Sequence, residues 1–353
     1  MEFYKRVMNY QDFSILLKQI IRSIKTQNEY LMLLYEIAKT ATKLDGTHFF
    51  ISSYSPNMNG KNFPKSHSIP VGIILQGPLP KNKKFLLETI RIYNQNFSMP
   101  RIFVSTWENE DAAFISKISK LENITVVLNK RPVYDTPDHF NSMVCSVLNS
   151  LKKMKELGIQ YIMRTRTDQR IILSNSDLFF LSLLKQFPLT AGKQKERIIT
   201  INFYTLLYIP FHISDMFQFG HIDDLMEYWS VEYLNRKFSS KSIYDVKVCD
   251  LERYQLSEQY LGLQYAYKKI GKRNLANNYQ AYLNFLKDRF IIVDAHILGF
   301  IWDKLYGDIF SYPNADQQLM QVILFNDWLY LYSQKIDFSE FCRLNNEKLK
   351  MYF

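Results

Sequence analysis

Short apolar runs alternate with helical patterns between residues 70 and 170. The runs are rich in Ile, Val and Leu and have the length of buried strands. The predicted strands cover residues 71–75, 101–105, 124–128 and 159–165, and the predicted helices cover 82–96, 109–120 and 138–157. This alternation predicts an α/β fold with a mostly parallel central sheet flanked by helices.

The two ends of the chain have helical patterns instead. Two amphipathic helices are predicted before a polar loop at 52–70, and helices and aromatic-rich loops follow residue 270. In between, the pattern predicts helices at 175–187, 221–235 and 256–270 and strands at 197–203 and near the end of 208–220. We therefore predict a helical N-terminal extension (1–68), an α/β domain (69–270) and a helical C-terminal region packed on that domain (271–353).

Polar residues follow each of the four predicted strands. Ligands bind outside the carboxyl ends of the strands in open α/β sheets, so a site is expected along this edge. The first three strands run into Gln76, Gly77 and Pro78, into Ser105, Thr106 and Trp107, and into Asn129, Lys130 and Arg131. Trp107 could stack on a base or a sugar, or it could pack beneath a loop.

The fourth strand runs into charged residues at every second position. These residues are Arg164, Arg166, Asp168 and Arg170. In an extended chain they would share one side. A surface ion-pair ladder is one interpretation. The apolar start of the strand favours the other, in which the arginines bind a diphosphate and Asp168 binds a divalent ion or a sugar hydroxyl.

Further candidates lie later in the chain. Asp215 could hold a donor or acceptor hydroxyl, or could be an ordinary turn residue. Glu258 begins a predicted helix, where Ser257 would be the cap and the acid would favour the helix N-terminus. His212 and Ser214 lie beside Asp215 and are candidate contacts for the acceptor sugar, although a lone histidine is more often structural.

The formal net charge of +10 favours anionic partners. The lysines are scattered, so we expect no nucleic-acid partner. No run reaches the ~18 apolar residues of a membrane span, and the first residues lack a signal-peptide core. We expect a cytoplasmic protein. The basic amphipathic helix near the start could contact the inner face of an anionic membrane or pack on its own domain.

Several common sites are absent from the sequence. It contains no GxGxxG, GxxxxGK[ST], HExxH or GxSxG motif. Three widely separated cysteines fit neither a disulfide framework nor a zinc site. We therefore expect neither a usual dinucleotide site nor a P-loop, and nothing indicates a zinc protease site.

The segments at the strand ends resemble the WavE family, which is associated with lipopolysaccharide and surface-polysaccharide synthesis. The resemblance covers about residues 70–270. It is carried by IILQGP (73–78), STWE (105–108), Asn141 and Ser146, YIMRTRTDQRI (161–171) and FHISDMFQFG (211–220). It implies a GT-A-like fold that binds a nucleotide-sugar, usually with an Asp-x-Asp motif after the fourth strand.

The resemblance also implies roles for particular residues. Gln76–Pro78 and Ser105–Trp107 would form the nucleotide pocket, and Asn141 would belong to the same donor site. Arg166 and Asp168 would occupy the Asp-x-Asp position. One carboxylate replaces two there, so arginines could neutralise the leaving diphosphate without a metal. Glu258 would activate the acceptor.

We therefore predict a glycosyltransferase that uses a nucleotide-sugar and a lipid-linked or oligosaccharide acceptor. The catalytic candidates are Asp168, Glu258 and Asp215. Manganese or magnesium at Asp168 is an option that we do not favour. A sugar nucleotidyltransferase and a non-catalytic adaptor that binds glycan or membrane are the alternatives. The nucleotidyltransferase would normally have a glycine-rich loop after the first strand, where only Gly77 stands.

Overall fold

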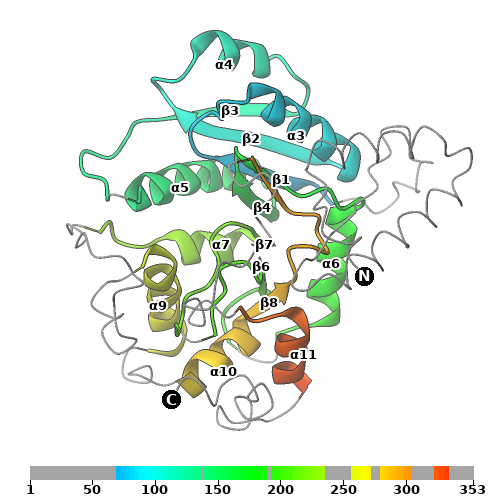
Figure 1. Ribbon diagram of the computed structural model, residues 1–353, viewed down its shortest axis with the longest axis vertical. Helices are drawn as coiled ribbons and strands as arrows, with labels where there is room; N and C mark the ends of the chain where they lie inside the picture. Colours follow the sequence, from blue (N-terminus) through cyan, green and yellow to red (C-terminus); the bar gives the residue numbers. More distant parts are fainter. Residues whose placement is uncertain are drawn as a thin grey trace, which may run out of the picture. The chain divides into compact units, whose positions relative to one another are not determined.

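Figure 1 shows a computed structural model of the chain. The structure describes residues 69–136, 138–189, 192–207, 209–234, 256–271, 279–303 and 322–333. All of these belong to one compact unit. The predicted N-terminal extension at 1–68 lies outside the described residues, as do Cys249 and Cys342.

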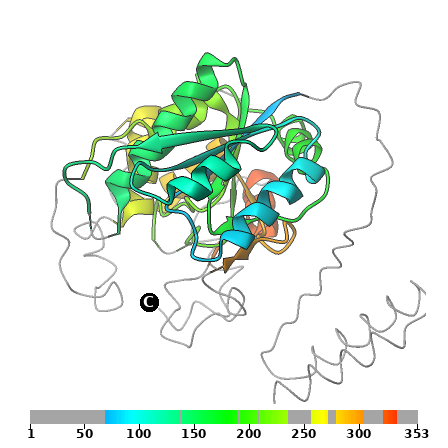
Figure 2. The same ribbon diagram turned by 90° about the horizontal axis from the view of Figure 1, so that it is seen from above.

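The first part of the described chain forms a parallel half-sheet. Its strands are β1 (Val71–Gln76), β2 (Pro100–Trp107), β3 (Ile124–Asn129) and β4 (Tyr161–Arg166), and its helices are α3 (Lys83–Asn96), α4 (Ala112–Ile118) and α5 (Phe140–Glu156). β1 lies between β2 and β4, and β3 pairs with β2, all in parallel. α3 and α4 cover one face and α5 the other (Figures 1 and 2). The predicted α/β alternation is confirmed here.

The rest of the described chain completes the sheet. It contains β5 (Gln169–Arg170), α6 (Ser176–Gln186), β6 (Ile198–Ile201), β7 (Gln218–His221), α7 (Ile222–Trp229), α9 (Ser257–Ile270), α10 (Tyr279–Arg289), β8 (Phe290–Val293), β9 (Ile301–Trp302) and α11 (Phe325–Ser333). The strand order is β3-β2-β1-β4-β7-β6-β8, and β7 runs antiparallel to both of its neighbours. The mostly parallel sheet predicted from the sequence is therefore confirmed.

The region after residue 270 contains two strands that the sequence reading missed. α10 and α11 are helices, as predicted. However, β8 pairs in parallel with β6 at the edge of the central sheet, and β9 pairs with β5 in a small second sheet. β8 follows α10 without an intervening residue, so no turn signal separates its short apolar run from the helix. The central sheet thus extends past residue 270.

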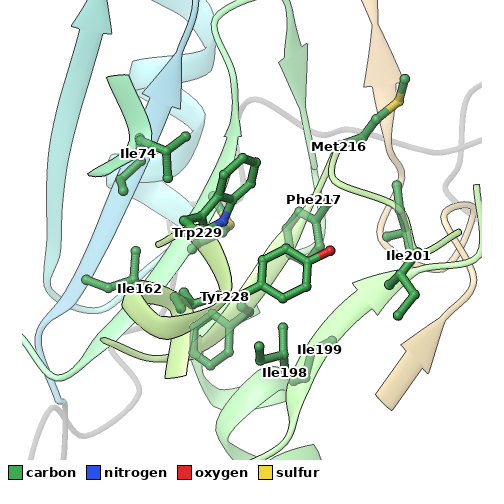
Figure 3. Packing of buried hydrophobic residues seen from close by; sticks show 14 of the residues in the cluster. Ile74, Ile162, Ile198, Ile199, Ile201, Met216, Phe217, Tyr228 and Trp229 are labelled. Atoms are coloured by element: carbon green, nitrogen blue, oxygen red, sulfur yellow. The ribbon is translucent and has the colours of Figure 1, made fainter. Parts of the chain in front are cut away.

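Part of the core lies between the central sheet and α7. Ile74, Ile162 and Ile198 come from three strands and lie near Tyr228 and Trp229 of α7 (Figure 3). All five side chains are buried. This packing fixes α7 beside β4 and β7, under the charged end of β4. Within the part of the chain that the structure describes, no helix is long and apolar enough to cross a membrane.

Candidate active site

The carboxyl ends of the central parallel strands lie side by side. In the strand register, Gln76 is opposite Ser105 on one side and Arg166 on the other. Two backbone bonds extend this pairing past the strand ends. Gly77 N donates to the Ser105 carbonyl at 3.0 Å, and Thr167 N donates to the Gln76 carbonyl at 3.1 Å. The polar ends of β1, β2 and β4 therefore lie side by side, and a ligand site along this edge stays a prediction.

The turn after β1 is held tightly against the end of β4. Thr167 Oγ1 donates to the Pro78 carbonyl at 2.6 Å. Gly77 has a φ of +125°, which side-chain-bearing residues rarely adopt. A Cβ at this position would also lie 3.4 Å from Thr167 Oγ1. Gly77 therefore serves the backbone geometry of a close turn, and Pro78 is the exposed member of the turn.

The predicted nucleotide residues at the end of β2 are buried. They are Ser105, Thr106 and Trp107, the last three residues of the strand. Ser105 Oγ donates to a carbonyl of α5 at 2.9 Å and accepts from Asn129 Nδ2 at 3.0 Å. The guanidinium of Arg131 lies 4.6 Å from the ring centre of Trp107. Ser105 therefore ties β2 to α5 and β3, and the contact of all three residues with a nucleotide stays a prediction.

The expectation that four charged side chains share one side of a strand is wrong. β4 ends at Arg166, and a turn at Thr167 and Asp168 separates it from β5, so the strict alternation is broken. The three arginines consequently have different partners. Arg164 Nη2 donates to Gln76 Oε1 at 2.8 Å. Arg170 pairs with Glu88 of α3 at 2.9 Å and lies over a phenylalanine ring of that helix.

Arg166, at the end of β4, pairs with Asp168 in the turn that follows. Arg166 Nε and Nη2 donate to Oδ1 and Oδ2 of Asp168 at 3.0 and 3.3 Å. Trp302 Nε1 also donates to Oδ2 at 3.1 Å, and the Arg166 guanidinium lies 5.6 Å from the centre of the Trp302 ring. The Arg166 side chain is 28% exposed and that of Asp168 9%. Arg166 is therefore the more accessible member of the pair.

Arg164 lies beneath this pair as a buried positive charge. It is fully buried, and its guanidinium lies 4.9 Å from the ring centre of Trp229. Burial lowers the pKa of Arg164 to about 10, and the nearby charge of Asp215 opposes that change. Its burial argues against direct phosphate contact. We interpret Arg164 as an internal countercharge for the acids above it.

Three candidate acids act on the charge of Arg166. Burial lowers the pKa of Arg166, but the charges of Asp168, Asp215 and Glu258 more than offset this and raise the pKa above its usual value. Asp168 does so through direct contact with the guanidinium, and Asp215 and Glu258 through their charges.

Glu258 has an unusually high affinity for its proton. Burial raises the pKa of its carboxyl to about 8, and the charges of Asp215 and Asp138 act in the same direction, while Arg166 opposes them. The Nε2 atom of His212 lies 3.8 Å from Glu258 Oε2. A carboxyl that titrates near neutral pH is suited to acid–base chemistry.

His212 is buried in its neutral form. Burial lowers the pKa of His212 to about 4, even though Tyr204 favours the charged ring. His212 Nδ1 is 2.9 Å from the Tyr204 carbonyl, so Nδ1 carries the proton and donates it to that oxygen. The unprotonated Nε2 therefore faces Glu258. His212 is therefore a neutral neighbour of the Glu258 carboxyl and not a second cation beside Arg166.

A glycine in α9 sets the position of Glu258. A Cβ on Gly262 would lie 2.0 Å from the carbonyl oxygen of Phe211, so only glycine allows the helix to approach this closely. Gly262 is one helical turn after Glu258, and Phe211 immediately precedes His212. The contact therefore fixes the Glu258 side of the helix against the loop that carries His212.

Other predicted residues have structural partners. Asn141 Nδ2 donates to the carbonyl of Leu234 at 2.9 Å, and its Oδ1 accepts from the Leu234 N at 2.8 Å. Ser214 is fully buried and accepts from Met216 N at 3.4 Å. The expected cap role of Ser257 is wrong, because its hydroxyl donates to Asp138 and makes no cap bond to its own helix. Asn141 and Ser214 thus face protein groups, and their substrate roles stay predictions.

The arrangement around Asp168 does not fit a divalent cation. Both carboxylate oxygens accept hydrogen bonds from Arg166 or Trp302, and a guanidinium stands where a cation would have to approach. Elsewhere among the described residues, no group of three or more His, Cys, Asp or Glu side chains could hold a metal ion. Arg166 supplies positive charge next to Asp168, and independence from a metal stays a prediction.

Trp302 is the residue of this site that the sequence reading missed. It lies 134 positions after Asp168 and belongs to a two-residue strand in the region predicted to be helical. No local pattern marks such a short strand. Its pairing with β5 alone brings the indole to the carboxylate.

Comparison with solved structures finds partial likenesses. A glycosyltransferase involved in the glycosylation of the major capsid of PBCV-1 is 10% identical, with 65% of this chain and 82% of that chain covered and a TM-score of 0.29. A cytidylyltransferase from Leptospira borgpetersenii is 12% identical, covering 75% and 93%, with a TM-score of 0.33. The glycosyltransferase GlyE of Streptococcus pneumoniae is 11% identical, covering 80% and 64%, with a TM-score of 0.30.

Comparison of the sequence with family models finds one matching family. Curated proteins show no match. The family model described as WavE lipopolysaccharide synthesis matches residues 71–352, which include the parallel half-sheet, Asp168, Glu258 and Trp302. The match covers most of the chain and extends well beyond the strand-end segments. The chain therefore belongs to the WavE lipopolysaccharide synthesis family.

Proposed function

We propose that this chain is a glycosyltransferase that moves a sugar from a nucleotide-sugar to a lipopolysaccharide or other surface-glycan acceptor. Its membership in a lipopolysaccharide synthesis family supports the substrate class. The observation that carries the chemistry is the partly exposed guanidinium of Arg166, which contacts Asp168 and whose pKa is raised further by the charges of Asp215 and Glu258. A cation beside several acids, at the carboxyl edge of the sheet, suits transfer of a group from a diphosphate.

The leaving group needs positive charge. As the bond between the anomeric carbon and the diphosphate oxygen breaks, its electrons stay on that oxygen and the nucleoside diphosphate departs. Arg166 is the accessible guanidinium at the site and would stabilise this charge by two-point hydrogen bonds. The Arg170 side chain is only 9% exposed and Arg164 is fully buried, so Arg166 is the most accessible of the three.

The acceptor needs a base. Its hydroxyl oxygen forms the new bond to the anomeric carbon while its proton passes to a carboxylate. Glu258 is our first candidate, because a pKa of about 8 matches a proton transfer near neutral pH better than an ordinary carboxylate does. Asp215 lies in the same neighbourhood and is the second candidate.

A lipid-linked acceptor would place the protein at an anionic membrane. The net charge of +10 favours that contact. We therefore propose peripheral binding to the inner face of the cytoplasmic membrane. Co-sedimentation with anionic liposomes, for the whole chain and for a chain lacking residues 1–27, tests this. Equal retention of both would exclude the first predicted helix as the anchor, and no retention of the whole chain would reject the contact.

A donor screen tests the proposal. The whole protein is mixed with UDP-, GDP-, CMP- and dTDP-sugars, and both thermal stabilisation and release of the nucleotide product are followed. We expect one nucleotide class to stabilise the protein and to be hydrolysed slowly without acceptor. A sugar nucleotidyltransferase would instead make a nucleotide-sugar from a sugar phosphate and a nucleoside triphosphate. Absence of binding to every nucleotide would favour a non-catalytic adaptor.

A further inference from the structure

Trp302 reaches Asp168 from a distant part of the chain. β9 pairs with β5 so that Trp302 lies opposite Gln169 and Ile301 lies opposite Arg170. Asp303 N also donates to the Asp168 carbonyl at 2.9 Å. Backbone and side-chain contacts therefore both join this short strand to the turn after β4.

The indole has a fixed orientation at that position. Its N–H donates to Asp168 Oδ2 at 3.1 Å, and its ring centre lies 5.6 Å from the Arg166 guanidinium. The ring of Phe203 packs edge-on against Trp302 at 6.3 Å between centres. Trp302 therefore contacts both members of the Arg166–Asp168 pair with different parts of its side chain.

The Arg166–Asp168 pair occupies one edge of the guanidinium that a diphosphate could use. Arg166 uses Nε and Nη2 on Asp168, which leaves Nη1 and the second N–H of Nη2 to a ligand, so a diphosphate that binds the Nε–Nη2 edge has to displace Asp168. Arg166 is also the more exposed partner, at 28% against 9%. An arriving diphosphate would thus meet the guanidinium first and compete with Asp168 for it.

If Arg166 moved to a phosphate, the Asp168 carboxylate would lose the cation to which it is hydrogen-bonded. Asp168 is largely buried, and a buried carboxylate is costly when a hydrogen-bonded cation is withdrawn. The indole N–H of Trp302 is a donor to Asp168 that does not depend on Arg166. The indole N–H carries no charge and is not drawn to the phosphate. It can therefore stay bonded to the Asp168 carboxylate while Arg166 moves from Asp168 to the phosphate.

We propose that Trp302 is a positioning residue that holds Asp168 in place when the diphosphate of the donor draws Arg166 away. The inference rests on the proposed function, because it takes a nucleoside diphosphate as the ligand. It adds a residue and a sequence of contacts that the proposed function does not require. In the free protein Arg166 is bound to Asp168. In the donor complex Arg166 is bound to phosphate and Asp168 to Trp302.

The substitution Trp302→Phe tests the role of the N–H. It keeps a ring beside Arg166 and removes only the hydrogen bond to Asp168. We expect the Kd for the nucleoside diphosphate, measured first with UDP, to change less than about 3-fold. The kcat for nucleotide release should fall roughly 10- to 100-fold, because a misplaced catalytic group costs turnover more than binding. Trp302→His, which retains a ring N–H, should recover part of the loss.

A matched control uses another indole. Trp328 is fully buried, and its Nε1 donates to the Leu286 carbonyl at 3.4 Å, in contact with α10 rather than with Asp168. Trp328→Phe removes an indole hydrogen bond in the same way and should leave kcat unchanged. Thermal unfolding of all variants shows whether a loss of activity merely reports a loss of folded protein.

A double-mutant cycle tests whether Trp302 affects turnover through Asp168. If Trp302 acts through Asp168, Trp302→Phe should change kcat little in a chain that already carries Asp168→Asn. A full-size effect in that background would overturn the inference, as would unchanged kcat in the single variant. If the wild type binds no nucleoside diphosphate and hydrolyses no donor, the proposed function fails, and with it the premise of the exchange. If the wild type is active and Trp302→Phe equals it, the exchange alone is rejected.

Discussion

Burial makes Glu258 ionise over the pH range in which the protein would be assayed. The pKa of this carboxyl rises from the ordinary value of 4.5 to about 8. A base acts only in its ionised form, so kcat/KM should rise roughly tenfold for each pH unit below about 8 and level off above it. Glu258→Gln should lose most of the activity and this pH-dependent limb. Glu156→Gln, on an exposed acid of α5, should keep both. An unchanged pH profile in Glu258→Gln would reject Glu258 as the base.

The same carboxyl should also affect stability. Because the folded protein holds the proton more tightly than the unfolded chain, the stability that Glu258 contributes is fully present below pH 4.5 and is lost as the pH rises towards 8. Glutamine cannot ionise and has no such dependence. The Tm of Glu258→Gln relative to the wild type should therefore increase between pH 5 and pH 8. A constant difference in Tm across this range would show that Glu258 ionises normally.

The sequence predicts the surroundings of some candidate residues and not those of others. Asp168 and Arg166 were predictable, because a charged end of an apolar strand is unusual. Arg164 obeys the same alternation, yet its side chain turns into the core against Trp229. Trp302 could not be predicted, since its role depends on a pairing between two-residue strands. Periodicity identifies which face a residue is on only while the strand continues, and here the strand ends at Arg166.

The position of α9 depends on a close backbone contact that only glycine allows. Gly262 faces the Phe211 carbonyl, and a Cβ there would lie 2.0 Å from that oxygen. Gly262→Ala should therefore push the helix away from the loop and move Glu258 relative to His212 and Arg166. We expect a lower Tm and a loss of kcat of roughly 100-fold. Gln264→Ala on the same helix should have little effect. Wild-type turnover in Gly262→Ala would mean that the position of α9 is unimportant to the reaction.

The elements that were predicted correctly have strong local signals. Each strand of the parallel half-sheet is an apolar run, and each intervening helix repeats apolar residues on one face. β8 has the same apolar character, but it directly follows α10 and therefore lacks a boundary. Its identity as a strand is decided by the free edge of β6, which it pairs with. Tertiary pairing, rather than local propensity, explains what the sequence reading missed.

The sheet needs its last strand to be complete. A chain that ends at residue 270 would retain the candidate acids but lose β8, and β6 would then expose an unpaired edge and an apolar surface. We expect this shortened chain to aggregate or to lack a cooperative thermal transition, whereas a chain ending at residue 333 should fold. A cooperative transition in the shorter chain would show that residues 69–270 form an independent domain.

Nucleotide release by Arg166→Ala and Asp168→Asn tests the central claim most directly. The donor is the one found in the screen. The control is Arg101→Ala, which removes an exposed arginine at the start of β2, at the end of the strand opposite the candidate site. We predict that Arg166→Ala weakens nucleotide binding and that Asp168→Asn lowers turnover roughly 100-fold or more. Arg101→Ala should resemble the wild type, and a chelator should change little. Near-normal binding and turnover in both Arg166→Ala and Asp168→Asn would contradict the account.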